Sequence, residues 1–227
     1  MSIAENLIRV LARISHAEHK NGRNHGSVRL LAVSKTKPID AVQAAVDAGQ
    51  RCFGENYLQD ALPKIEYFRD QNLEWHFIGP IQSNKTRSIA ESFDWVHSVD
   101  RLKIAQRLSE QRPEELPDLN ICIQVNLSGE ASKSGLTADE LVDLLKACTL
   151  LKRIQIRGLM LIPAANTNFE QQKQVFQQLA NLLQRMNQQL GLKMDTLSMG
   201  MSADLEAAIA AGSTIVRIGT DIFGARQ

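Results

Sequence analysis

Lys35 is the residue of this 227-residue chain whose position most clearly suits covalent chemistry. It ends the first apolar run, 28–35, and stands inside the segment 34–38 (SKTKP). Because alternate residues of a strand share one face, Lys35 is predicted to lie on the same face as Val33 and Lys37. An amine held against an apolar wall is disfavoured in its charged form, so its pKa falls and it can attack an aldehyde to form a Schiff base. The alternative is a lysine at a strand end that extends its ammonium group into solvent.

Two glycine-containing segments near the C-terminus carry groups that bind phosphate in other proteins. Segments 198–202 (SMGMS) and 217–220 (RIGT) end the last two predicted strands, and they contain Gly200, Ser202, Gly219 and Thr220. Glycine lets backbone N–H groups approach an anion closely, and the hydroxyl groups add donors. In (β/α)8 barrels, phosphate is often bound by the loops after strands seven and eight. Either segment alone would equally fit an ordinary helix cap or an ordinary glycine at a strand end.

Three further polar residues lie in or after predicted strands. Arg217 precedes Thr220 by three residues, at a depth from which its guanidinium group can reach a ring bound above a barrel, although an internal carboxylate partner is an equal alternative. Asn56 follows the second predicted strand and is expected to cap a helix or to contact a ligand. His76 shares a strand face with Ile78, a setting more typical of a core histidine than of a catalyst. No HxxxH, HxH or Asp/His cluster occurs, so we expect no metal site.

The elements that must position these residues alternate between short apolar runs and segments of helical period. Eight runs are predicted as strands: 28–35, 51–55, 74–79, 95–99, 119–127, 154–162, 196–200 and 214–221. The predicted helices between them include 38–48, 101–111, 137–150, 168–190 and 203–211, with Asp100, Thr137 and Ser202 as expected N-caps. Strands so rich in Val, Ile and Leu suit a parallel sheet that helices cover.

This order predicts the α/β fold class and, within it, a parallel (β/α)8 TIM barrel. We expect one domain over residues 1–227, which includes an extra amphipathic helix at the N-terminus. An open doubly wound sheet is the alternative, but no GxGxxG motif follows the first strand to support dinucleotide binding.

Composition excludes several classes of partner. Lys and Arg number 26 against 25 Asp and Glu, and no basic block occurs, so nucleic acid is not an expected partner. The N-terminus lacks the continuous apolar stretch of a signal peptide, and no segment is apolar enough to span a bilayer, so no membrane is expected. Three cysteines without a CxxC pair argue against a disulfide framework and a structural zinc site. We therefore expect a cytoplasmic protein, and a monomer.

Seven motifs in this order resemble those of the pyridoxal phosphate homeostasis protein family. They are LAVSKTKP (31–38), FGENY (53–57), EWHFIGPIQSNK (74–85), NLSGEASKSG (126–135), RGLMLIP (157–163), LSMGMSADLEAAI (197–209) and VRIGTDIFGAR (216–226). Members of that family are stand-alone relatives of the N-terminal barrel domain of alanine racemase. The resemblance implies a barrel of that type, alanine racemase N-terminal-domain-like, which binds pyridoxal 5′-phosphate (PLP).

The resemblance also implies a role for each matching residue. Lys35 corresponds to the lysine that forms the Schiff base with PLP, and Arg217 to an arginine that faces the pyridine nitrogen. The implied phosphate ligands are Ser202, Gly219 and Thr220, and the residues implied to line the rest of the pocket are Asn56, Ile78, Met160 and Met201. No key position departs from the family's pattern.

Three functions fit these residues. The first is a PLP carrier or regulator without turnover of its own, which serves PLP homeostasis and the balance of amino and keto acids, with apo PLP-dependent enzymes as recipients. The second is a PLP-dependent racemase or decarboxylase, and the third is a barrel aldolase that uses Lys35 without a cofactor. The carrier is favoured because a two-base racemase needs a second acid/base group, which the related racemase takes from a separate C-terminal domain. A chain that ends at Gln227, with Tyr57 beside the barrel and Tyr67 expected on the outer surface, is not expected to supply one.

Arginine opposite the pyridine nitrogen strengthens that preference. It cannot accept a proton, so it weakens the electron sink that PLP catalysis requires. Lys37 and Lys133 are expected near the barrel mouth, where each is either a participant in PLP exchange or a plain surface lysine.

Overall fold

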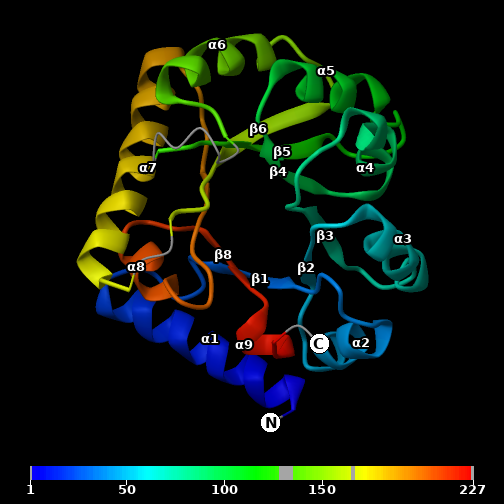
Figure 1. Ribbon diagram of the computed structural model, residues 1–227, viewed down its shortest axis with the longest axis vertical. Coiled ribbons are helices and arrows are strands. Elements are labelled where there is room, and N and C mark those ends of the chain that lie inside the picture. The colour runs from blue at the N-terminus through cyan, green and yellow to red at the C-terminus, as the bar shows by residue number, and fades with distance from the viewer. Residues whose placement is uncertain (1, 128–134, 165–166, 226–227) are drawn as a thin grey trace.

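Eight parallel strands close into a barrel in the computed structural model, which describes residues 2–127, 135–164 and 167–225 (Figure 1). Each strand pairs with the next along the chain, and β1 pairs with β8. The strands are β1 (Arg29–Val33), β2 (Cys52–Glu55), β3 (Glu74–Phe77), β4 (Trp95–Val99), β5 (Leu119–Gln124), β6 (Ile154–Met160), β7 (Thr196–Ser198) and β8 (Ile215–Ile218). The predicted (β/α)8 barrel is confirmed, and all eight strands run so that their carboxyl ends meet at one mouth.

Helices surround the barrel, and the additional N-terminal helix α1 lies alongside α8 and α9 (Figure 1). The helices are α1 (Ile3–Lys20), α2 (Ile39–Asp47), α3 (Leu58–Tyr67), the 3-10 turn η1 (Ser83–Lys85), α4 (Thr86–Ser92), α5 (Leu102–Gln111), α6 (Ala138–Cys148), α7 (Phe169–Leu190), α8 (Leu205–Ala210) and α9 (Thr220–Phe223). In the described part of the chain, none of them combines the length and the apolar character that crossing a bilayer requires.

The predicted helix caps are correct in one case and wrong in three. Thr137 caps α6 through a capping box with Glu140. The prediction for Asp100 is wrong, because α5 begins after Arg101 and the Asp100 carboxylate accepts a hydrogen bond from the Arg101 side chain instead. Asn56 does not cap α3, whose N-cap position is occupied by Tyr57 without a side-chain hydrogen bond.

Ser202 does not cap α8 either. The helix begins at Leu205, two residues later than expected, with Asp204 in the N-cap position. The Asp204 carboxylate accepts a hydrogen bond from the Met201 backbone N–H at 2.6 Å, so it closes a turn ahead of the helix. Ser202 therefore lies in that turn, at the barrel mouth, rather than at the helix start.

The core has an apolar layer between strands and helices and a mixed interior inside the barrel. The outer layer contains most of the buried aliphatic and aromatic side chains. Inside the barrel, two small apolar clusters are formed by Leu31, Val33, Ile78 and Ile215, and by Trp95, Cys122 and Met160. Polar side chains are buried in the same interior, among them His76, His97, Ser198 and Arg217. The barrel is thus packed throughout, with polar groups enclosed between its two apolar clusters.

Candidate functional site

A cavity of about 300 Å³ opens at the mouth where the strands end. Eight of the nine residues predicted to contact a cofactor line it: Lys35, Asn56, Ile78, Met201, Ser202, Arg217, Gly219 and Thr220. They come from the ends of β1, β2, β3, β7 and β8, so closure of the barrel brings together residues up to 185 positions apart along the chain, from 35 to 220. We call this cavity the mouth pocket.

Met160 is the one predicted residue that does not line the mouth pocket. It is fully buried below it and packs with Trp95 and Cys122. Ile162, two residues further along, lines the pocket instead. Residues two apart on a strand share a face, so that spacing could have identified Ile162 as the residue nearer the mouth.

Lys35 occupies a tight turn with a strained neighbour. The Lys37 backbone N–H donates to the Ser34 carbonyl oxygen at 3.0 Å, and Thr36 has a φ of 62°. This left-handed conformation is unusual for a β-branched residue and costs roughly 1–3 kcal/mol. Strain of this kind persists where the surrounding structure imposes it, and here it coincides with the lysine of the pocket.

Ser34, the residue before Lys35, is fixed by a buried ion pair. Its hydroxyl group donates to Glu55 Oε1 at 2.7 Å, and its carbonyl oxygen accepts from Lys64 Nζ at 2.8 Å. Lys64 and Glu55 are themselves 2.8 Å apart and almost fully buried. Burial raises the pKa of Glu55, while Lys64 opposes that shift. The ion pair anchors the backbone from which the Lys35 side chain extends into the pocket.

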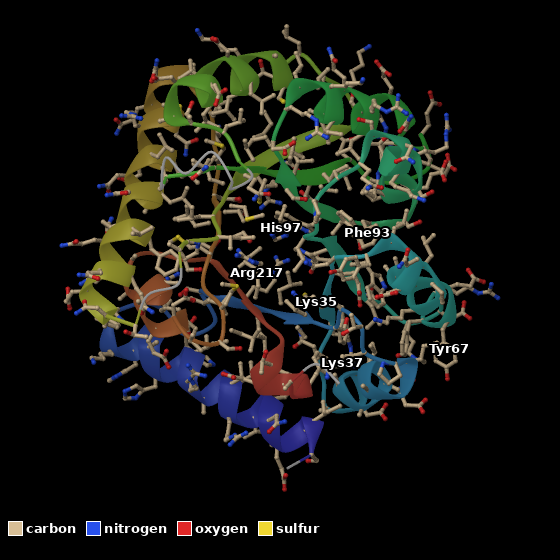
Figure 2. All side chains as sticks on the ribbon, in the orientation of Figure 1. Lys35, Lys37, Tyr67, Phe93, His97 and Arg217 are labelled. Atoms are coloured by element: carbon tan, nitrogen blue, oxygen red, sulfur yellow. The ribbon has the colours of Figure 1, made fainter. Side chains whose placement is uncertain are left out.

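Arg217 is 5% exposed and is held by oxygen atoms of two neighbouring segments. One terminal nitrogen donates to the carbonyl oxygen of Ser198 at 2.6 Å and to its Oγ at 2.9 Å, and the other donates to the Leu161 carbonyl oxygen at 3.0 Å. Within the described residues no carboxylate forms an ion pair with Arg217, but the buried Asp204 carboxylate acts on it electrostatically, so the alternative of an internal carboxylate partner is supported in this weaker form. Burial lowers the pKa of Arg217 to about 10. Figure 2 shows Arg217, Lys35 and His97 inside the ring of strands, whereas Tyr67 lies on the outer surface as expected.

The hydroxyl groups of Ser202 and Thr220 lie at the part of the pocket formed by the loops after β7 and β8. Gly219 lies so close to β1 that a Cβ atom there would be 3.1 Å from the Val33 carbonyl oxygen. Two carboxylates beside these loops, Glu206 and Asp221, would repel an anion if they were unpaired.

Arg13 of α1 forms ion pairs with both carboxylates and so offsets part of their negative charge. Its guanidinium group lies 2.8 Å from Glu206 and 2.5 Å from Asp221, and it also donates to the Ser202 carbonyl oxygen at 3.0 Å. The N-terminal helix therefore contributes directly to the loops that carry the hydroxyl groups, a role that sequence reasoning did not identify.

Asn56 offers an acceptor that the described part of the protein leaves without a partner. Its Oδ1 atom is buried and makes no hydrogen bond with any described residue. Its backbone is held by close packing, because a Cβ atom on Gly79 would lie 2.1 Å from the Asn56 carbonyl oxygen. A buried acceptor of this kind at a cavity wall is suited to a donor group of a ligand.

Lys37 also lines the mouth pocket, as expected, and its ammonium group donates to the Ala225 carbonyl oxygen at 3.0 Å. Lys133, the other lysine expected there, lies outside the described residues. The role of either lysine in exchange stays a prediction.

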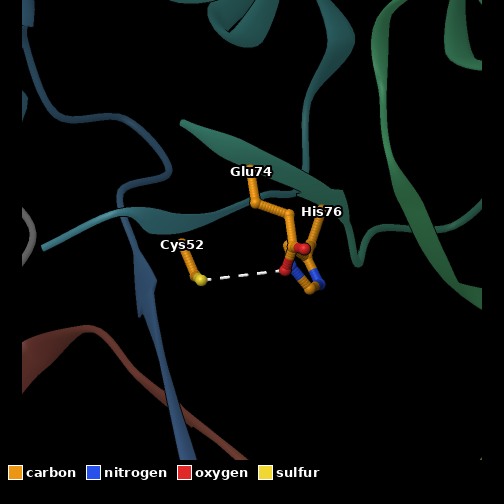
Figure 3. A group of neighbouring side chains, drawn as sticks. All are labelled: Cys52, Glu74 and His76. Carbon is orange, nitrogen blue, oxygen red and sulfur yellow. Dashed lines mark hydrogen bonds and ion pairs between the residues drawn. The ribbon is translucent and has the colours of Figure 1, made fainter. Parts of the chain in front are cut away.

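Cys52, Glu74 and His76 form a cluster at the opposite mouth of the barrel (Figure 3). Sequence motifs indicated no metal site, but these three residue types do bind metals, and their potential ligand atoms lie within 4.8 Å of one another. The contacts favour a hydrogen-bonded cluster instead, because Glu74 Oε1 already pairs with Arg29 at 2.5 Å and with His76 Nε2 at 2.7 Å.

Comparisons with known proteins agree with this geometry. Residues 11–227 match the family model for the N-terminal domain of alanine racemase. The pyridoxal phosphate homeostasis protein of Pseudomonas aeruginosa is 60% identical over 226 residues, covering 100% of this chain and 96% of that protein. The protein of that name from Escherichia coli (strain K12) is 54% identical over 233 residues, covering 99% and 97%.

Solved structures show the same fold. PipY of Synechococcus elongatus, determined with PLP bound, is 37% identical with a TM-score of 0.87, and the match covers 98% of this chain and 100% of that one. An alanine racemase from Clostridium difficile 630 shares the fold at 14% identity and a TM-score of 0.74, covering 98% of this chain and 57% of the racemase.

Proposed function

The chain belongs to the pyridoxal phosphate homeostasis protein family, and we propose that it binds PLP in the mouth pocket and serves as a carrier and regulator of PLP supply. The observation that carries the proposal is the combination of side chains in that one cavity. It offers an amine, a guanidinium group, two hydroxyl groups and a buried amide oxygen without a partner among the described residues.

Each of these groups suits one part of PLP. The Lys35 amine attacks the aldehyde carbon, and loss of one water molecule leaves a Schiff base between the two. Ser202, Thr220 and the backbone at Gly219 donate hydrogen bonds to the phosphate. Arg217 donates to the ring nitrogen, while Asn56, Ile78 and Met201 contact the remaining edges. Bound PLP supplies an aldehyde that reacts reversibly with amines, which is the property a carrier needs.

The same residues argue for a carrier without turnover of its own. Arg217 is a donor only, so it cannot take a proton from the ring nitrogen, and the electron sink of PLP stays weak. Among the described residues, the titratable side chains that line the pocket are Lys35, Lys37 and Arg217. A two-base racemase needs a second acid/base group opposite the lysine, and neither Lys37, which is hydrogen-bonded to Ala225, nor Arg217 suits that role. A cytoplasmic location, a monomeric state and apo PLP-dependent enzymes as recipients are parts of this proposal.

A transfer experiment tests it. The PLP-loaded protein is mixed with an apo PLP-dependent enzyme, with and without a trap that consumes free PLP, and recovery of the recipient's activity is followed. We expect recovery in the presence of the trap, and no recovery from the Lys35→Ala variant under the same conditions. Abolition of all recovery by the trap would contradict direct delivery. Turnover of alanine or another amino acid at roughly 1 per second or faster would instead favour a racemase or a decarboxylase.

A further inference from the structure

A continuous chain of hydrogen bonds crosses the barrel interior from Glu74, at the mouth opposite the pocket, to Arg217. Glu74 Oε1 is 2.7 Å from His76 Nε2, and His76 Nδ1 is 2.8 Å from His97 Nε2. His97 Nδ1 is 2.7 Å from Ser198 Oγ, which is 2.9 Å from the Arg217 guanidinium group. The three residues in the middle of the chain are fully buried, so no solvent competes for these bonds.

The chemistry of the two ends determines the direction of every bond. Arg217 only donates, and an ionised carboxylate only accepts. Because Ser198 Oγ accepts from Arg217, its hydroxyl hydrogen is directed to His97 Nδ1. His97 then carries its proton on Nε2 and donates to His76 Nδ1, and His76 carries its proton on Nε2 and donates to Glu74.

The opposite set of tautomers leaves groups unsatisfied. If His97 carried its proton on Nδ1, Ser198 Oγ would accept hydrogen bonds from both His97 and Arg217. The Ser198 hydroxyl hydrogen would then have no acceptor among the residues of this row of hydrogen bonds. His76 would then direct a lone pair at the Glu74 oxygen. Each unsatisfied buried group costs about 1–3 kcal/mol. Burial lowers the pKa of both histidines, which keeps each ring neutral with one donor and one acceptor.

Glu74 is well suited to be the acceptor that ends the chain. Its Oε1 atom also accepts from Arg29 at 2.5 Å and lies 3.7 Å from the Cys52 thiol, which Figure 3 shows beside it. Burial acts to raise the pKa of Glu74, but the hydrogen bond from His76 and the positive charge of Arg29 lower it. The carboxylate is therefore ionised at neutral pH.

This chain of bonds connects the buried guanidinium group to a second, more distant negative charge, in addition to the Asp204 carboxylate that acts on it electrostatically. A buried cation without a direct carboxylate partner is costly, and a row of hydrogen bonds polarised in one direction connects it to a negative charge. We propose that Glu74 is a positioning residue for the mouth pocket, which sets the tautomers of His76 and His97 and thereby holds Arg217 in the orientation that serves the ring nitrogen of PLP. The part that concerns the ring rests on the proposed function, whereas the tautomers do not.

The tautomers are tested in the protein without PLP. Nitrogen-15 NMR correlation spectra of the histidine rings should show protons on Nε2 and none on Nδ1 for both His76 and His97. The Glu74→Leu variant removes the charge and the acceptor from a half-buried position, so its spectra should no longer show protonation on Nε2 alone. Glu74→Gln should largely retain the Nε2 protonation, because the amide oxygen can still accept the hydrogen bond from His76. A proton on Nδ1 of either histidine in the unaltered protein would overturn the assignment.

The positioning role is tested with a ligand pair that differs at one atom, PLP and its analogue with carbon in place of the ring nitrogen. Glu74→Leu should weaken PLP about tenfold and the analogue less than about threefold. Asp195→Leu is the matched control, because Asp195 also pairs with an arginine, Arg157, beside Trp95, but does not contact the histidines. It should change neither affinity. Equal losses for the two ligands would contradict the role, and failure of the unaltered protein to bind PLP would refute the proposed function while the tautomer result stands.

Discussion

Thr36 links backbone strain to the position of Lys35. Its φ of 62° occurs in the turn that directs Lys35 into the pocket. The same turn is held at Ser34, whose hydroxyl group donates to Glu55 and whose carbonyl oxygen accepts from Lys64. The strained conformation therefore serves to position the Lys35 amine and does not stabilise the barrel.

We expect Thr36→Gly to leave the free energy of unfolding unchanged or to raise it by up to about 1 kcal/mol. Glycine adopts the left-handed conformation without strain, and that gain offsets the extra freedom it gives the unfolded chain. Urea-induced unfolding measures the effect, and Thr36→Val, which keeps a β-branched side chain, should give no gain. A loss of more than about 1 kcal/mol in Thr36→Gly would show that the threonine side chain stabilises the turn.

Ser202 and Thr220 are expected to act on the phosphate and on no other part of the ligand. The double variant Ser202→Ala, Thr220→Ala should bind PLP far more weakly, since each lost charge-assisted hydrogen bond costs on the order of 1.5–3 kcal/mol, which is tenfold or more in affinity. Binding of pyridoxal, which has no phosphate, should change little. Equal losses for the two ligands would place the hydroxyl groups away from the phosphate.

Single residues differ in how far the sequence could reveal them. Lys35 could be identified from the sequence as a pocket residue because it follows an apolar strand, and the carboxyl ends of the strands meet at one mouth in a parallel barrel. Met160 was predicted to line the pocket because it lies in a motif that resembles those of the family. It lies two residues before Ile162 along the chain, and Ile162 is the residue that reaches the mouth. His76 was correctly interpreted as a buried residue. Its connection to Arg217 through His97 and Ser198 depends on closure of the barrel, which brings residues more than 100 positions apart into contact.

Among the helices, α1 has the least expected role. It was predicted as an amphipathic addition to the barrel, and it supplies Arg13 to the two loops that carry Ser202 and Thr220. No local pattern in the sequence indicates these partners, because Glu206 and Asp221 lie about 200 residues away.

We expect Arg13→Ala to weaken PLP binding roughly threefold to tenfold, because the carboxylates of Glu206 and Asp221, beside the loops after β7 and β8, lose their counter-charge. Pyridoxal binding should be much less affected. Arg9→Ala is the matched control one turn away on the same helix, where Arg9 bonds only to Asn6 among described partners and is exposed. Binding is measured by titration at low and high salt. An equal effect of both substitutions would indicate a general influence of positive charge on α1.

Strands and loops differ in how well their ends were predicted. The strand starts are within one residue of the structure, but several predicted strands extend too far at the carboxyl end: 214–221 was expected, whereas β8 ends at Ile218 and α9 begins at Thr220. Thr220 is β-branched and was counted with the strand, yet the chain turns away from its neighbours at the mouth to form the loops of the site. Pattern alone cannot identify where pairing stops.

For the molecule as a whole, the fold was predictable because one rule repeats eight times. Buried strands alternate with amphipathic helices, and a parallel arrangement is the one that covers both faces of such strands. What the repeat does not reveal is the polar interior. Glu74 lies at one mouth and Arg217 near the other, and hydrogen bonds between buried polar side chains connect the two through the core of the barrel.

We propose that Lys35 holds PLP covalently, and reduction of the PLP-loaded protein with borohydride, followed by peptide mapping, tests this. Reduction fixes a Schiff base as a stable amine at the lysine that formed it. We predict a single pyridoxyl adduct on Lys35, and none in the Lys35→Ala variant, with Lys37→Ala as the matched control that keeps the adduct. An adduct on Lys37 or Lys133 with none on Lys35, or no adduct at all, would show that Lys35 does not hold PLP covalently.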